Sequence, residues 1–185
     1  MMKPIKRLPD HVVNQIAAGE IIQRPANALK ELLENSIDAS ADIIRIELIL
    51  GGTKLIKVMD NGCGIPKEDL PLALERHATN KITSFNDIKH LISLGFRGEG
   101  LASMASISRC RLTSKVPSAI YAYSISSLNG QLSDISVASH PDGTTVEVND
   151  IYFNVPARKK FMKSAATEYA YARDIVCLLY TSDAA

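Results

Sequence analysis

The sequence predicts an α+β fold, a two-layer α/β sandwich with a mixed, mostly antiparallel sheet. Helical patterns and one β-hairpin fill the first part of the chain, and several short strand candidates follow one another towards its end. These strand candidates are evenly spaced and separated by turn residues such as Asn129-Gly130, which favours antiparallel connections. Helices and strands in this order are typical of a domain that packs its helices against a sheet.

Two helices are predicted before the hairpin. Asp10 can cap the first helix, which ends near Gly19. The second begins at Pro25, a residue favoured at the first helical position, and stops near Ala39. Its apolar residues fall at helical spacing, so we expect one face of this helix to be buried.

A β-hairpin follows the second helix. Residues 42–50 place Ile44, Ile46, Leu48 and Leu50 on one strand face, and residues 53–60 form the return strand. Gly51-Gly52 lies between them and suits a two-residue turn.

The rest of the chain predicts a helix with Glu68 and Asp69 in its first turn, a long segment over 75–100 and then more regular structure. Residues 75–100 show little periodicity beyond a turn or two of helix in DIKHLISL, and such a long irregular segment is usually functional or mobile. A helix opens directly after its glycines. The later elements are strands over 110–116, 120–126, 132–138 and 143–150, and a last helix that begins near Pro156 and carries Phe161, Ala165, Tyr169 and Ala172.

Composition excludes several classes of protein. Of the 185 residues, 46% are hydrophobic and 22% charged, as in an ordinary globular domain, and the net charge of +1 gives no global attraction to a polyanion. The three cysteines Cys63, Cys110 and Cys177 are far apart, which argues against a disulfide framework or a zinc site and fits a reducing cytosol. No run approaches the ~20 apolar residues of a membrane span.

Glu31 and Asn35 form the first chemical motif. They are four residues apart in the Pro25 helix and therefore project from one face, one turn apart. A carboxylate can take a proton from water, and an amide oxygen is a hard ligand for Mg²⁺, so the pair suits metal-assisted hydrolysis. A solvated helix face would show the same spacing.

The segment DNGCGIP supplies the second motif. Asp60 ends a strand, and Gly62 and Gly64 follow it. An ionised carboxylate only accepts hydrogen bonds and so suits an exocyclic amine such as that of adenine, while glycines let the backbone approach a ligand closely. A plain turn is the alternative interpretation.

A second glycine loop, GFRGEG over residues 95–100, opens a helix. Free backbone N–H groups and the helix dipole at such a position favour an anion. The loop matches neither the Walker nor the Rossmann pattern, because its spacing is GxxGxG and no strand precedes it. A flexible hinge is the alternative.

These three motifs, in this order, resemble the GHKL ATPases, the group with the Bergerat fold that includes gyrase, Hsp90, histidine kinases and MutL. The longer segments NQIAAGEIIQRPANALKELLENSIDA, DNGCGIP, RHATNKI, SLGFRGEGLASM and GTTVEVNDIYFNVPARKKF resemble the MutL family of DNA mismatch repair proteins. The resemblance extends from about Leu8 to about Val176.

The resemblance implies ATP and Mg²⁺ as cofactors and assigns a role to each matching residue. Glu31 would be the general base that orients the attacking water, and Asn35 would hold Mg²⁺. Asp60 would bind the adenine amine, with Gly62 and Gly64 shaping the base pocket and Thr144 at its floor. The lid over the phosphates would comprise Thr79, Arg97, Gly98, Glu99, Gly100 and Leu101.

The sequence departs from the family pattern at four places. Gly100 stands where the family usually has Ala, Asn80 where it has Ser, and Ser40 where it has Gly. The last residues, LLYTSDAA, do not resemble the family. We therefore expect an ATPase domain over residues 1–178, a probable non-native tail over 179–185, and no transducer or C-terminal dimerisation domain.

Arg158, Lys159 and Lys160 form a compact basic patch, with Lys163 one turn on. By resemblance this side of the molecule contacts DNA through phosphates, weakly and without sequence preference. A solvated helix start is the alternative.

The expected function is that of an ATP-switched matchmaker in mismatch repair, an Mg²⁺-dependent ATPase. Its implied partners are a MutS-type mismatch-recognition protein, DNA and a second copy of the intact protein, and no membrane; its implied location is the bacterial cytoplasm, near the nucleoid. Two alternatives remain. One is another GHKL enzyme, against which RHATNKI and GFRGEGLASM speak, and the other is an ATP-dependent scaffold or DNA-binding module without useful turnover.

Overall fold

The computed structural model describes residues 6–76, 78 and 98–183. The side chains of Asp10 and His11 and of residues 181–183 are outside this description. The predicted lid residues Thr79 and Arg97, Asn80 and the DIKHLISL segment also lie outside the described residues.

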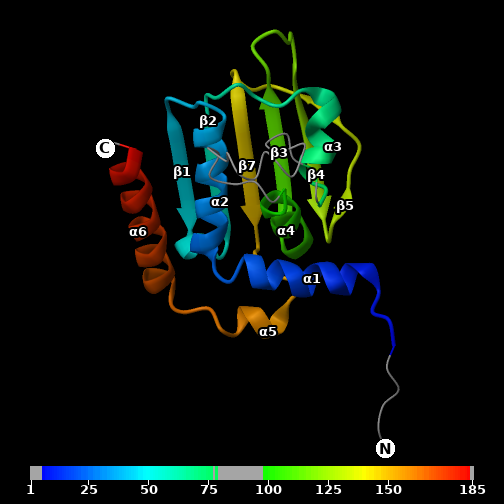
Figure 1. The fold of residues 1–185 in the computed structure, drawn as a ribbon, viewed down its shortest axis with the longest axis vertical. Helices are drawn as coiled ribbons and strands as arrows, with labels where there is room; N and C mark the ends of the chain where they lie inside the picture. The colour runs from blue at the N-terminus through cyan, green and yellow to red at the C-terminus, as the bar shows by residue number, and fades with distance from the viewer. Residues whose placement is uncertain (1–5, 77, 79–97, 184–185) are drawn as a thin grey trace, which may run out of the picture.

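One sheet forms a layer of the molecule (Figure 1). Its strands follow the order β1-β2-β7-β3-β4-β5, and β6 also pairs with β4. Every strand pairing in the described part of the chain is antiparallel, so the predicted fold class is confirmed with a sheet that is antiparallel rather than mixed. The strands are β1 (Ile44–Ile49), β2 (Leu55–Asp60), β3 (Arg109–Lys115), β4 (Ala122–Leu128), β5 (Gln131–Leu132), β6 (Ser136–Ala138) and β7 (Gly143–Asn149).

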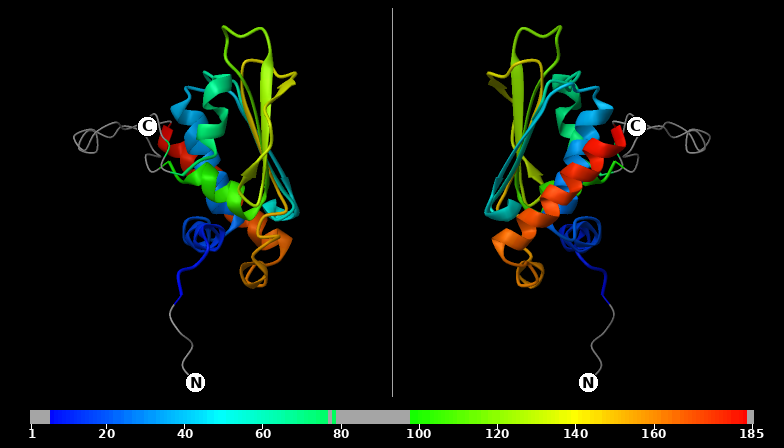
Figure 2. Two further views of the ribbon diagram at one scale, coloured as in Figure 1. Left: turned by 90° about the vertical axis from the view of Figure 1, so that its right-hand side faces the viewer. Right: turned by 90° about the vertical axis from the view of Figure 1, so that its left-hand side faces the viewer.

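The helices cover one face of this sheet, and no helix of the described residues lies on the opposite face (Figure 2). Helix α2 lies along the sheet, α6 packs against α2, and α1 and α5 lie at one end (Figure 1). The helices are α1 (Asp10–Ile21), α2 (Pro25–Asp38), α3 (Leu70–Ala73), α4 (Gly100–Ile107), α5 (Pro156–Lys159) and α6 (Ala165–Asp183), with short 3₁₀ turns η1 (Leu50–Gly52) and η2 (Lys67–Asp69).

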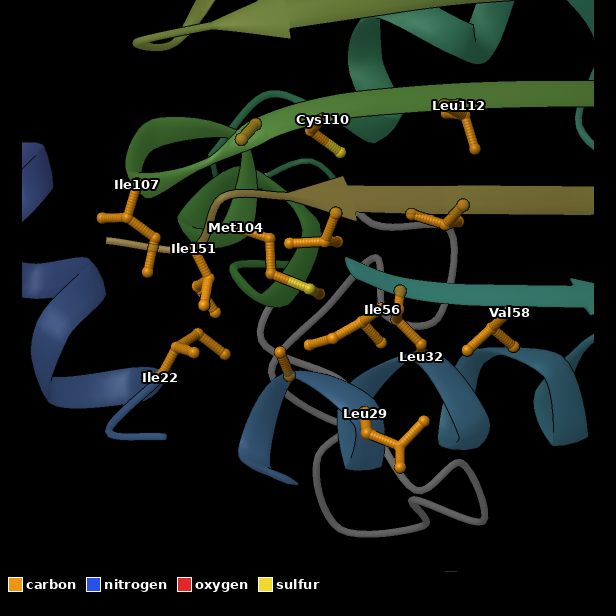
Figure 3. Packing of buried hydrophobic residues seen from close by; sticks show 14 of the residues in the cluster. Ile22, Leu29, Leu32, Ile56, Val58, Met104, Ile107, Cys110, Leu112 and Ile151 are labelled. Atoms are coloured by element: carbon orange, nitrogen blue, oxygen red, sulfur yellow. The ribbon is translucent and has the colours of Figure 1, made fainter. Parts of the chain in front are cut away.

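The hydrophobic core lies between the helices and the covered face of the sheet. Figure 3 shows Leu32 of α2 beside Ile56 and Val58 of β2, with Met104 of α4 nearby and Leu29 further along α2. These five side chains are at most 2% exposed. Alternate residues of β2 and β3 are buried, as expected for strands of a sheet with one buried face.

Helix α6 is attached to the domain by a buried carboxylate. Glu168 is 1% exposed, accepts a hydrogen bond from Lys163 N at 2.9 Å and lies 3.9 Å from the Arg24 guanidinium. Arg24 in turn stacks over the ring of Tyr171, 4.1 Å from its centroid. These contacts connect α6 to the residue that precedes α2.

Two predictions about the first helices need correction, and one is confirmed. Helix α2 spans the predicted residues. Helix α1 continues past Gly19, because Ile22 N still donates to Ala18 O and Arg158 packs against the glycine. Its cap is Pro9, without a side-chain capping bond, rather than Asp10.

The hairpin is confirmed, but its turn is longer than the predicted two residues. Ile49 and Leu55 are the last paired residues, and the connection between them contains η1. Leu50 adopts a φ of 53° and therefore belongs to the turn rather than to the strand face.

The last predicted helix is two helices. Residues 160–164 separate α5 from α6, because Ser164 begins a new helix by accepting a hydrogen bond from Thr167 N. Phe161 lies in this connection and is exposed. The strand predicted over 132–138 is likewise divided into β5 and β6.

Candidate functional site

Asp60 lies at the end of β2 with a side chain that is almost wholly buried, 8% exposed. Its Oδ1 accepts hydrogen bonds from Gly62 N at 2.9 Å and Thr144 N at 3.2 Å. Its Oδ2 accepts one from Ser36 Oγ at 2.9 Å. Oδ1 therefore has two donors and Oδ2 has one, which leaves acceptor capacity on Oδ2 for a ligand.

The glycines after Asp60 are required by close backbone contacts. A Cβ at Gly62 would lie 2.7 Å from Ala39 O, and one at Gly64 would lie 2.3 Å from Lys115 O. Gly64 also has a φ of 72°, a conformation that favours glycine. Both glycines thus let the loop after β2 pack against neighbouring backbone, at the end of the strand that carries Asp60.

Thr144, the second residue of β7, lies directly opposite Asp60, and Ser114 of β3 lies opposite Thr144 on its other side. The hydroxyl oxygens of Ser114 and Thr144 are 2.8 Å apart. Ser114 Oγ also accepts a hydrogen bond from Ile65 N at 2.8 Å and donates one to Gly143 O at 2.9 Å. A row of three polar residues therefore crosses three strands beside the glycine loop.

Glu31 and Asn35 lie one turn apart on α2, both half-buried. The structure brings Glu31 beside Gly100, the first residue of α4, since a Cβ there would lie 2.5 Å from Glu31 Oε2. The carboxylate thus lies at the N-terminal end of α4, next to the predicted second glycine loop. Ser36, on the same helix, points to Asp60 instead.

The described lid residues lie at the start of α4. Gly98 has a φ of 60°, Glu99 precedes the helix and accepts a hydrogen bond from Ser103 N at 2.8 Å, and Leu101 packs against the core. The glycine loop therefore ends beside Glu31. The lid roles of these residues, and of Thr79 and Arg97, remain predictions.

The side chains of Glu31 and Asn35 suit a metal ion that is bound together with the phosphates of a nucleotide. Among residues 6–76, 78 and 98–183, no cluster of three or more His, Cys, Asp or Glu side chains could hold a metal ion. Asn35 and Glu31 offer only hard oxygen donors, and Mg²⁺ in proteins is usually held by one or two such side chains together with substrate phosphates and water. The residues present fit Mg²⁺ on those terms.

The basic residues lie away from this site, in and after α5. Arg158 packs against Gly19 of α1, whose Cβ would be 3.0 Å from Arg158 Nη2, while Lys159 and Lys160 are exposed. A hollow of about 460 Å³ lies between the two helices. It is lined by Gln15, Ile16, Gly19, Glu20, Val155, Ala157, Arg158 and Phe161. Contact of these basic residues with DNA stays a prediction.

Ser36 and Ser114 are site residues that the sequence-based prediction missed. Ser114 is 1% exposed and Ser36 is 2% exposed. Ser114 follows Cys110 and Leu112 on the buried face of β3, so its alternation with apolar residues was an available signal. A polar residue at such a position needs a partner, but the partner itself is distant in sequence.

The family comparison assigns this fold to a known class of ATPase domain. Residues 23–151 match the model of the family described as histidine kinase-, DNA gyrase B- and HSP90-like ATPase, and the chain belongs to this family. The ATPase resemblance noted in the sequence is thereby confirmed.

The relatives narrow the similarity to MutL proteins. The chain is 57% identical over 170 residues to the DNA mismatch repair protein MutL of Neisseria meningitidis, covering 92% of this chain and 26% of the relative. It is 50% identical over 172 residues to MutL of Coxiella burnetii, covering 93% of this chain and 30% of the relative. The chain is a MutL homologue that spans between a quarter and a third of the length of these curated relatives.

Solved structures show the same similarity. The Aquifex aeolicus MutL ATPase domain complexed with ADP superposes with a TM-score of 0.67 and 30% identity, covering 84% of this chain and 54% of that one. The N-terminal domain of a DNA repair protein gives a TM-score of 0.73 and 30% identity, covering 89% of this chain and 47% of that one. In the described part of the chain, no helix is long and apolar enough to cross a bilayer.

Proposed function

We propose that this chain is the ATP-binding and ATP-hydrolysing domain of a MutL-type DNA mismatch repair protein. The observation that carries the proposal is the buried carboxylate of Asp60, which accepts hydrogen bonds from Ser36 of α2, Thr144 of β7 and Gly62 of the loop that follows it. A buried carboxylate with remaining acceptor capacity is matched to a ligand that donates hydrogen bonds.

Asp60 recognises the base. Its Oδ2 accepts a hydrogen bond from the exocyclic amine of adenine, and the loop at Gly62 and Gly64 shapes the pocket around the ring. Loss of the carboxylate therefore removes a charge-assisted hydrogen bond in a buried setting.

Glu31 and Asn35 act on the phosphates. Glu31 accepts a proton from the attacking water and orients it, from a position beside the first residue of α4. Asn35 offers its amide oxygen to Mg²⁺, which when bound neutralises phosphate charge. Positioning and charge stabilisation dominate such a reaction, so small displacements of Glu31 cost rate.

In the longer protein, nucleotide binding closes the lid, whose last residues are Gly98–Leu101, over the phosphates and promotes pairing of two copies. Hydrolysis resets this switch. The proposed partners are a MutS-type mismatch-recognition protein and DNA, the latter through phosphate contacts of Arg158, Lys159 and Lys160. The names of the bacterial relatives, DNA mismatch repair proteins, support this role, and the proposed location is the cytoplasm near the nucleoid.

Steady-state hydrolysis of MgATP by the parent chain, Glu31→Gln and Glu34→Gln tests the proposal. Glu34 is the matched control, because it lies on the same helix but pairs with Lys30 Nζ at 3.1 Å. We expect Glu31→Gln to lose at least about tenfold in kcat with little change in ATP affinity, and Glu34→Gln to retain the parent rate. Equal rates in all three would remove the enzymatic claim and favour a binding module without turnover.

A further inference from the structure

The hydroxyl of Ser114 has three hydrogen-bond partners but only one proton to donate, and this determines the direction of each hydrogen bond. A serine hydroxyl has one proton to donate and two lone pairs that accept. Ile65 N is a donor and takes one lone pair, and Gly143 O is an acceptor and takes the proton. The second lone pair is left for Thr144, whose Oγ1 is 2.8 Å away.

This assignment makes Thr144 the donor to Ser114. With its only proton directed at Ser114 Oγ, Thr144 Oγ1 presents lone pairs alone to anything else that approaches it. Its backbone N–H is also engaged, by Asp60 Oδ1 at 3.2 Å. Ser114 is 1% exposed and Thr144 is 8% exposed, so water does not readily supply a substitute partner.

Asp60, Thr144 and Ser114 form a row across β2, β7 and β3. At the Asp60 end of this row, the atoms offered to a ligand are therefore all hydrogen-bond acceptors. Asp60 Oδ2 and Thr144 Oγ1 are both acceptors, on residues paired directly across two strands. A base with an exocyclic amine donates to such a surface, whereas a base with a keto oxygen meets it with another acceptor. An unpaired acceptor buried against an acceptor is costly, which is the basis of strong discrimination.

We propose that Ser114 is a positioning residue that sets nucleobase specificity, by holding the Thr144 hydroxyl as an acceptor and the Ile65 end of the glycine loop in place. The inference rests on the proposed nucleotide-binding function. Ser114 itself makes no contact with the base and acts through Thr144.

The test compares the affinities of ADP and inosine diphosphate, which has a keto oxygen in place of the 6-amino group and carries a proton on N1. Because the N1 proton is common to all measurements, the change in preference between parent and variant reports on the Thr144 hydroxyl. Calorimetry on the 185-residue chain gives both values of Kd and their ratio. We expect the parent to prefer ADP by at least about tenfold, and Ser114→Ala to reduce this preference by about three- to tenfold, because the Thr144 hydroxyl can then rotate and donate to the keto oxygen.

Ser127→Ala is the matched control. Ser127 is also a buried serine on the covered face of the sheet, but its hydroxyl donates to Ala105 O, away from the row. We expect its nucleotide preference to equal that of the parent. A double variant Ser114→Ala with Thr144→Val should show the preference of Thr144→Val alone, whereas additive losses would contradict action through Thr144.

A pair of isosteric variants keeps the test decisive if Ser114→Ala folds poorly. Ser114→Thr and Ser114→Val have equal bulk and both suit a strand, but only the first keeps a hydroxyl. The inference predicts that Ser114→Thr retains more of the parent preference than Ser114→Val. If the parent binds ADP and every Ser114 variant shows the same nucleotide preference as the parent, this inference alone is overturned. If a folded parent binds neither nucleotide, the proposed function is overturned as well.

Discussion

The carboxylate of Glu31 lies against Gly100, so close that a Cβ at Gly100 would be 2.5 Å from Glu31 Oε2. The two residues are far apart in sequence, and their contact joins the middle of α2 to the start of α4. The atom that limits the space at Gly100 is the far end of a flexible side chain. The contact therefore restricts the position of Glu31 more than it restricts the residue type at position 100.

Two glycine substitutions compare the side-chain contact at Gly100 with the backbone contact at Gly64. Gly64→Ala should lower the free energy of unfolding by more than about 2 kcal/mol, because its φ is 72° and the new Cβ would lie 2.3 Å from Lys115 O. Gly100→Ala should keep the parent stability within about 1 kcal/mol, since Glu31 can rotate away and Ala favours helix. Urea unfolding measures both, and equal losses would contradict the distinction.

Ser40→Gly should stabilise the protein. Helix α2 ends in a Schellman motif, in which Ala41 N donates to Ser36 O and Ser40 N to Ile37 O. Ser40 has a φ of 57°, a conformation that costs most residues about 1–2 kcal/mol and glycine almost nothing. We expect a net gain of about 0.5–1 kcal/mol after the greater freedom of glycine in the unfolded chain is subtracted.

The control for Ser40→Gly is Ala39→Gly, one residue earlier. Ala39 has a φ of −79°, which any residue adopts, so glycine there should only destabilise. A loss of stability in both variants on thermal unfolding would show that the strain at Ser40 does not matter.

The sequence predicted these elements unevenly, and the reasons are physical. Helix α2 was predicted with its bounds because Pro25 and the apolar spacing are local signals. Gly19 was taken as a helix end, yet Arg158 packs against it from a segment distant in sequence. Packing from elsewhere in the chain thus overrode a local preference.

The candidate site shows the same limit. Asp60 and its glycines form a short local motif, so their chemistry could be inferred from residue types. The partners of Asp60 and Ser114 come from α2, from β7 and from the glycine loop, and the strand register places Thr144 between the two residues. A hydrogen-bond row of this kind has no signature in a single segment.

Stability should fall at alkaline pH, with Cys110 as one cause. Burial, with a smaller contribution from Glu147, raises the pKa of its thiol from the ordinary value of 9.0 to about 12. The unfolded chain therefore loses this proton near pH 9 while the folded chain keeps it, so the stabilisation is complete below pH 9 and is lost towards pH 12. Burial also raises the pKa of Tyr152, which adds to the loss above pH 10.

The expected slope from Cys110 is about 1.4 kcal/mol per pH unit between pH 9 and 12. Urea unfolding at a series of pH values should give a shallower slope for Cys110→Ala than for the parent. Cys177 is exposed, so Cys177→Ala should keep the parent slope. Identical slopes in all three proteins would exclude Cys110 as a cause.

The most direct test of the central claim is the affinity for a non-hydrolysable ATP analogue with Mg²⁺, measured by calorimetry on the parent and on Asp60→Asn. The substitution keeps the shape of the side chain and replaces one acceptor oxygen with a donor. Asp142→Asn is the control, because Asp142 is an exposed carboxylate paired with Lys115. We predict that the parent and Asp142→Asn bind alike and that Asp60→Asn binds at least about tenfold more weakly, or about 1.4 kcal/mol. Equal binding by a folded Asp60→Asn variant would contradict the assignment of this buried carboxylate to the base.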